Sequence, residues 1–250
     1  MSGHSKWSSI KHKKGAADAK RGKLFSKLSR AIIVAAREGG PDPAANLALQ
    51  NAIEKARSYS MPKDNIERAI AKGAGTGDDG SVYETIVYEG YAPGGVAVLV
   101  EALSDNRNRT ASDVRHLFAK HDGNLGTSGA VAWLFERRGV VLVAGELDED
   151  EVLLAAAEGG AEDIAQDGSS WQVLSAPEDL RSVRAALEEA GIPVESAEIT
   201  MLPKTTVDVE DESTAKKILR LVDALDDNDD VQEVYANFDI PEGVLEAVAS

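Results

Sequence analysis

The stretch Gly73-Ala74-Gly75-Thr76-Gly77-Asp78-Asp79-Gly80 divides the chain into two parts that follow different patterns. Before it, hydrophobic residues recur with the period of a helix, and after it the sequence reads mainly as strands and helices in alternation. The charge changes sign at the same place, because residues 1–75 hold 15 Lys and Arg against 6 Asp and Glu, whereas residues 76–250 hold 12 against 37. Such a glycine-rich segment is typical of a flexible linker. We therefore expect a basic N-terminal domain over residues 1–78.

This first part is expected to be helical. The segment 17–38 places Leu24, Leu28 and Ile32 on one stripe of a helix, which ends at the glycines that follow. Two further helices are expected at 44–59 and 63–72.

The second part is expected to belong to the α+β class. Residues 140–202 read as strand, helix, two strands, helix and strand, the βαββαβ order of a ferredoxin-like unit. Strands are also expected at 82–88, 96–102, 130–135, 205–209 and 231–238, with helices at 109–120 and 213–225.

The segments 96–136 and 205–238 together repeat the same βαββαβ order. The economical interpretation is one ferredoxin-like domain inserted into another. We expect a discontinuous α+β domain made of residues 79–137 and 203–250, with residues 138–202 as the inserted α+β domain.

The N-terminal basic residues are the leading candidates for a binding site. Residues 1–30 carry nine Lys and Arg and one acidic residue, on a chain whose formal charge is −16. Such segregation points to a partner with phosphate groups. Lys20, Lys23, Lys27 and Arg30 share one helix face, and the segment before them has no helical period, as in arms that order on nucleic acid. The candidate nucleic-acid-binding residues are Lys6, Trp7, Lys11, His12, Lys13, Lys14, Lys20, Arg21, Lys23, Lys27 and Arg30.

A second candidate polar surface lies between an expected strand and an expected helix. Arg107, Asn108 and Arg109 concentrate charge and hydrogen-bonding groups in this loop. The alternative interpretation is a capped helix start, in which Asn108 or Thr110 satisfies backbone donors.

Motifs for catalysis or metal binding do not emerge. The chain has no cysteine, and its four histidines lack metal-ligand spacing. The run Asp226–Asp230 begins like a calcium loop but has Val231 where glycine is required, so we interpret it as a polar helix end. We expect no catalytic residues, no metal and no cofactor. Without a signal-like apolar segment, we also expect a cytoplasmic protein with no membrane partner.

Several long motifs, in order, resemble the YebC/PmpR family, which includes the mitochondrial translational activator of cytochrome oxidase. The motifs cover Gly3–Trp7, Ile10–Lys14, Asp18–Leu28, Pro62–Ile70, Tyr88–Val96 and Asp105–Thr110. The resemblance implies one helical and two α+β domains without enzymatic activity. It also implies either promoter binding as a transcriptional regulator or action on the ribosome at proline-rich nascent sequences. Within the family pattern, the basic motif is carried here by Lys6, Lys11, Lys13, Lys14, Lys20, Arg21, Lys23 and Lys27.

Three function hypotheses follow. The first is a regulator of gene expression that docks its basic domain on ribosomal RNA or on promoter DNA, with ribosomal proteins as further candidate partners. The lysine-rich face favours ribosomal RNA, because lysine grips phosphates and reads little base sequence. The alternatives are an acidic scaffold for protein interactions and an enzyme with a cleft between the two α+β domains.

Overall fold

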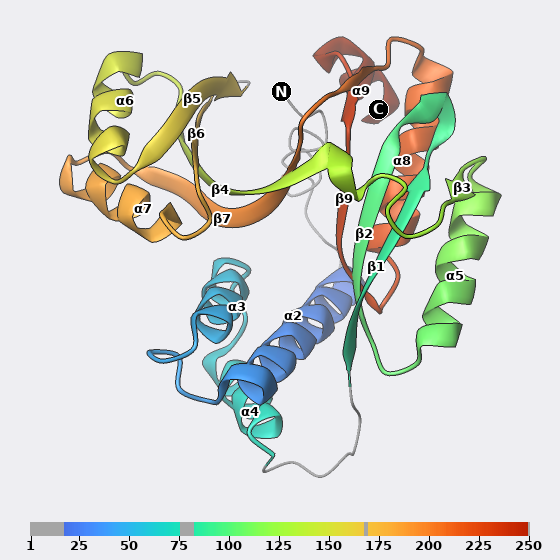
Figure 1. The fold of residues 1–250 in the computed structure, drawn as a ribbon, viewed down its shortest axis with the longest axis horizontal. Coiled ribbons are helices and arrows are strands. Elements are labelled where there is room, and N and C mark those ends of the chain that lie inside the picture. Colours follow the sequence, from blue (N-terminus) through green and yellow to red (C-terminus); the bar gives the residue numbers. More distant parts are fainter. Residues whose placement is uncertain (1–17, 76–82, 168–169, 250) are drawn as a thin grey trace.

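The computed structural model describes residues 18–75, 83–167 and 170–249. It contains a helical part and two four-stranded sheets (Figure 1). The basic arm expected before residue 18, and the linker residues 76–80, lie outside the described residues. Within the described residues the fold class is α+β, with a helical N-terminal region followed by antiparallel sheets, as the sequence predicts.

The helical part consists of α2 (Asp18–Gly39), α3 (Leu47–Ser58) and α4 (Lys63–Gly73). Its core is formed by the apolar faces of the three helices, including Leu28, Ile32, Leu49, Ile53 and Ile66. Asn46 begins α3 by accepting the amide hydrogen of Leu49 at 3.1 Å, as a helix N-cap does. Gly73 allows α4 to cross α2 closely, because a Cβ there would lie 2.5 Å from the carbonyl oxygen of Ile33.

The first sheet has the strand order β3-β1-β2-β9. Its strands are β1 (Glu84–Tyr91), β2 (Ala97–Ser104), β3 (Asn124–Leu125) and β9 (Val231–Ala236). Helices α5 (Arg107–Lys120) and α8 (Glu212–Asp226) pack on this sheet around Val98, Val100, Phe118, Ile218 and Leu221. The C-terminal helix α9 (Glu242–Ala249) packs against α8, and its Leu245 completes the same core.

The second sheet has the strand order β5-β6-β4-β7, with all neighbours antiparallel. Its strands are β4 (Phe135–Ala144), β5 (Ala161–Asp167), β6 (Ser170–Ser175) and β7 (Val194–Pro203). Helices α6 (Glu149–Glu158) and α7 (Leu180–Glu189) contribute Val152, Ala156, Val183 and Leu187 to the core of this part. The chain order strand, helix, strand, strand, helix, strand with this pairing is ferredoxin-like.

The first sheet has the same ferredoxin-like arrangement of four strands, but the strands that fill its positions come in a different order along the chain. The predicted strand 205–209 is only the short β8 (Val207–Asp208), which pairs in parallel with β10 (Phe238–Asp239) and lies outside the four-stranded sheet. The place expected for it, beside β2, is taken by β1, which precedes β2 in the chain.

The strand predicted at 130–135 is wrong. Residues Ala132–Leu134 form a 3₁₀ turn, and the strand that pairs with the outer edge of β1 is β3. The reason is the carboxylate of Glu89, which accepts the amide hydrogens of Gly129, Val131 and Ala132 at 2.6, 2.7 and 2.7 Å. Amide groups that donate to a side chain cannot also form a strand ladder.

Strands β4 and β7 run between the two sheets as one long pair (Figure 1). Their register joins Phe135 to Pro203 at one end and Val143 to Val194 at the other. Phe135 packs with Leu99 and Tyr235 in a small core on the first sheet. The division of the chain at residues 78, 137 and 202 into domains stays a prediction, which excision of the insert can test.

Among the residues that the structure describes, no helix is long and apolar enough to cross a membrane.

Candidate nucleic-acid interface

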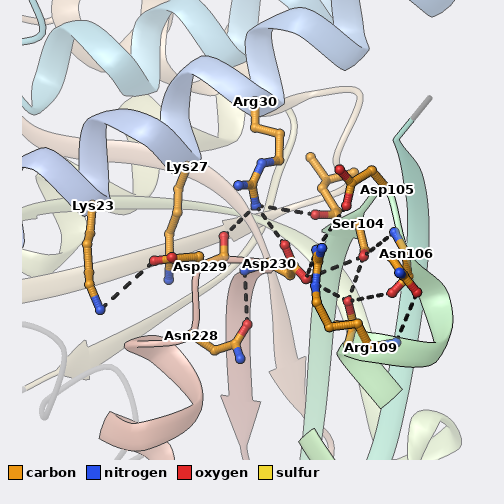
Figure 2. Close-up of polar contacts among 12 residues, drawn as sticks. Lys23, Lys27, Arg30, Ser104, Asp105, Asn106, Arg109, Asn228, Asp229 and Asp230 are labelled. Carbon is orange, nitrogen blue, oxygen red and sulfur yellow. Dashed lines mark hydrogen bonds and ion pairs between the residues drawn. The ribbon is translucent and has the colours of Figure 1, made fainter. Parts of the chain in front are cut away.

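The candidate basic residues divide into three groups. Lys6, Trp7, Lys11, His12, Lys13 and Lys14 lie outside the described residues. Lys20 and Arg21 lie in the first turn of α2, and Arg21 is exposed. Lys23, Lys27 and Arg30 lie further along α2 and contact another part of the chain (Figure 2).

The contact partner is the turn between α8 and β9, residues 226–230, which we call the acidic turn. Lys23 donates to the backbone oxygen of Asp227 at 3.3 Å, and its ammonium lies 4.0 Å from the carboxylate of Asp229. Lys27 donates to the backbone oxygen of Asp226 and lies 3.7 Å from its carboxylate. The spacing of three and four residues on α2 therefore places its cations against backbone oxygens of the turn.

Two features of the turn make it a good cation acceptor. It begins at the C-terminus of α8, where the last carbonyl groups lack helical partners and carry the negative end of the helix dipole. It also carries four carboxylates in five residues. Lys27 is buried in this contact, at 8% exposure. A buried ammonium group needs oxygen acceptors in place of water, and the oxygens of the turn supply them.

Asp230 is the buried centre of the network. Its carboxylate receives Arg30 from α2 at 3.3 Å and Arg109 from α5 at 2.8 Å, and Thr110 donates to it at 2.6 Å. Burial raises the pKa of this carboxyl group, but the bonds from Thr110 and Arg109 and the charge of Arg30 outweigh it, so that the pKa lies below its usual range. Asp230 is therefore ionised at neutral pH.

Arg30 ties several elements together. Besides Asp230, it donates to the backbone oxygens of Asp229 and Leu103, and its guanidinium lies 5.3 Å from the ring centre of Tyr83. A guanidinium over an aromatic face at this distance forms a cation–π contact.

The second predicted surface is split by this network. All three residues are exposed to solvent, but Arg109 also binds the carboxylates of Asp230 and Asp105. The cap of α5 is Asn106, which accepts the amide hydrogen of Arg109 at 3.1 Å, so neither Asn108 nor Thr110 has the capping role that the sequence left open.

The sequence did not predict that the acidic turn binds the basic residues of α2. Interpreting it as a polar helix end is correct for its backbone but overlooks its role as an acceptor for α2. The available signal was a run of four carboxylates in a chain whose basic residues recur along one helix face.

A second polar contact joins α3 to both sheets. Lys55 forms an ion pair with Glu233 on β9, and burial lowers its pKa while the charges of Glu233 and Glu198 raise it, with a net increase. Glu198 lies on β7, where burial raises the pKa of its carboxyl group. At the other end of α3, Gln50 accepts a hydrogen bond from Arg181 of α7 at 2.8 Å.

These contacts between the helical part and the sheets are polar. The described core of the helical part is made only of residues between 24 and 70, and the other three cores use residues from 88 onward. Polar interfaces of this kind are typical of domains that can separate.

The protein thus consists of a basic helical region, made of α2, α3 and α4, and two acidic sheet units, each made of one four-stranded sheet with the helices packed on it. The helical region lies against both sheet units. Residues 5–76 match the family model of the TACO1/YebC protein N-terminal domain, and residues 83–238 match that of the TACO1/YebC second and third domain. The chain belongs to the TACO1/YebC family, which confirms the resemblance seen in its motifs.

Relatives match over the full chain. A protein of Rubrobacter xylanophilus is 63% identical and one of Desulfotalea psychrophila is 56% identical, in each case over 100% of both chains. Both carry the name probable transcriptional regulatory protein. The crystal structure of a conserved hypothetical protein, Aq1575 from Aquifex aeolicus, superposes with a TM-score of 0.79 at 54% identity, covering 90% of this chain and 93% of that one.

Proposed function

We propose that this protein is a non-enzymatic, nucleic-acid-binding regulator of gene expression, and that its helical N-terminal region contacts the phosphate backbone. The observation that carries the proposal is the geometry of α2. Lys23, Lys27 and Arg30 present donors in a row to a succession of oxygen atoms, and each takes at least one backbone or carboxylate oxygen as acceptor. A row of this kind suits the repeating oxygens of a phosphodiester chain.

The distribution of charge supports the same surface. The net formal charge is +9 over residues 1–75 and −25 over residues 76–250. Phosphate groups are repelled by the sheet units and attracted by the helical region, so electrostatics alone orients the encounter.

Ribosomal RNA is the target that the side chains favour. Of the four cations that the sequence places on the α2 face, three are lysines, which bind phosphates as point charges. Direct reading of duplex DNA relies instead on Arg, Asn and Gln at base edges. In this role the protein aids the synthesis of proline-rich sequences, as its family resemblance implies. Promoter DNA is the second candidate, favoured by the name that the bacterial relatives carry.

The test is a competition between purified ribosomes and promoter duplex for the intact protein at fixed, near-physiological salt. Retention on ribosomes that rRNA-derived fragments compete away is expected. A preference for one promoter over scrambled duplex of about 10³-fold or more, the order typical of specific DNA binders, would exclude the ribosome as the main target. Failure to bind either polymer would exclude the proposed function as a whole.

A further inference from the structure

The face of α2 assigned to phosphate binding is occupied in this structure. Lys23 and Lys27 donate to backbone oxygens of the acidic turn, and Arg30 donates both to the backbone of that turn and to the carboxylate of Asp230 (Figure 2). The side chains of Lys27 and Arg30 are only 10% and 17% exposed in this contact, so a phosphate group can reach them only if the acidic turn moves away.

The acidic turn is held in shape by parts of the sheet unit that do not depend on α2. Asn228 accepts the amide hydrogen of Asp230 at 2.9 Å, and the backbone oxygen of Asp230 accepts the amide hydrogen of Leu103 at 2.8 Å. Arg109 and Thr110 fix the carboxylate of Asp230 from α5. The turn is therefore a preformed set of backbone and carboxylate oxygens rather than a flexible segment gathered by the lysines.

The helical region is held in this position by charge and not by a shared apolar core. Its described contacts with the rest of the chain include the acidic turn, the contacts of Arg30 with Leu103 and Tyr83, the ion pair of Lys55 with Glu233, and the polar contacts of α3 with α7. Such contacts weaken with salt and compete directly with another polyanion.

We propose that the acidic turn is an intramolecular mimic of a phosphate backbone, and that docking of α2 on it is an autoinhibited state of the nucleic-acid-binding surface. Nucleic acid gains access to Lys23, Lys27 and Arg30 when the helical region leaves the turn. The apparent affinity is reduced by the fraction of molecules in the open state. This inference rests on the proposed function and concerns the regulation of the same surface.

The test compares two variants of the full-length protein with equal net charge. Asp226→Asn with Asp229→Asn removes the two carboxylates that face Lys27 and Lys23, both partly exposed. Glu149→Gln with Asp150→Asn makes the same charge change at exposed positions on α6, far along the chain from the turn. Binding to a short double-stranded RNA is measured by fluorescence anisotropy at one salt concentration.

The turn variant is expected to bind about three- to tenfold more tightly than both the wild type and the α6 control, since an ion pair with a partly exposed carboxylate contributes up to roughly a fivefold factor. Binding equal to that of the control would overturn autoinhibition and leave the proposed function standing. If neither the wild type nor the turn variant binds nucleic acid at all, the proposed function fails and the competition fails with it.

A distance measurement reports docking without reference to affinity. Because the chain has no cysteine, Ala48→Cys on α3 and Ala119→Cys on α5, both exposed, can carry a donor and an acceptor dye. Energy transfer is expected to fall when the RNA is added and, in its absence, when salt is raised. Unchanged transfer at saturating RNA would show that binding leaves α2 on the turn, and would overturn the proposal even if the affinities differed.

Discussion

Arg30 of α2 and Arg109 of α5 bind the two oxygens of one carboxylate, that of Asp230, at 3.3 and 2.8 Å. The two cations come from different parts of the chain, one from the helical region and one from the first sheet unit (Figure 2). Asp230 thus has two roles. It stabilises its own sheet unit through Arg109 and Thr110, and it binds the helical region through Arg30.

Replacement of Asp230 by Ala is expected to destabilise the sheet unit by about 2–4 kcal/mol, because Arg109 and Thr110 lose a buried ionised acceptor. The free energy of unfolding in urea measures this loss. Asp105→Ala, which removes the exposed partner of the same Arg109, should cost less than about 1 kcal/mol and serves as the control. Equal losses for the two variants would contradict a central role for Asp230.

The pKa of Asp230 gives this stabilisation a pH dependence. Since the pKa is lower in the folded than in the unfolded state, the contribution is fully present above the ordinary pKa of an aspartate. It is lost as the pH falls through that range toward the folded-state pKa. The acid limb of the stability curve should therefore flatten in Asp230→Ala relative to the wild type, and an unchanged limb would argue against an ionised Asp230.

Glu89 is expected to control the loop that replaces the predicted strand at 130–135. Its carboxylate accepts three backbone amide hydrogens, and the residue is 5% exposed. Burial raises the pKa of the carboxyl group, but the three hydrogen bonds lower it by more, so the net shift is downward. Glu89→Gln keeps the size but offers one acceptor oxygen and adds donors, so a loss of about 2–3 kcal/mol is expected.

Hydrogen exchange locates that effect. The amides of Gly129, Val131 and Ala132 should lose protection in Glu89→Gln and keep it in Glu84→Gln, an exposed position on the same strand. Retained protection in Glu89→Gln would mean that the loop is held by packing instead.

The sequence predicts most helices within a few residues because each carries an unbroken apolar stripe, as Leu24, Leu28 and Ile32 do in α2. The strand at 130–135 failed for a physical reason: its run of apolar residues is compatible with a strand, but the distant Glu89 accepts the amide hydrogens of Val131 and Ala132. The exchange of roles between β1 and β8 could not be seen either, because element order along the chain does not fix which strands pair. The basic face of α2 was found from spacing, whereas its partner in the acidic turn depends on tertiary packing across about 200 residues.

Excision of residues 138–202 tests the proposed domain division. The two cut points lie next to each other, since Arg137 pairs with Met201 and Glu136 pairs with Leu202 across β4 and β7. A short Gly/Ser bridge should therefore leave the first sheet able to unfold cooperatively in urea. Loss of a cooperative transition in the remaining chain would show that the insert is needed for that sheet to fold.

The last prediction concerns the salt dependence of nucleic-acid binding. Replacing Lys23 and Lys27 by Ala should remove two phosphate contacts and reduce the slope of log K against log salt by roughly 0.7 to 0.9 per contact. The measured change in slope is expected to be somewhat smaller than this sum. The same substitutions weaken docking of α2 on the acidic turn and so increase the fraction of molecules in the open state. Arg57→Ala with Lys63→Ala, two exposed cations elsewhere in the helical region, is the matched control and should alter the slope less. An identical slope in wild type and in the Lys23/Lys27 variant would show that this face of α2 does not touch the phosphate backbone.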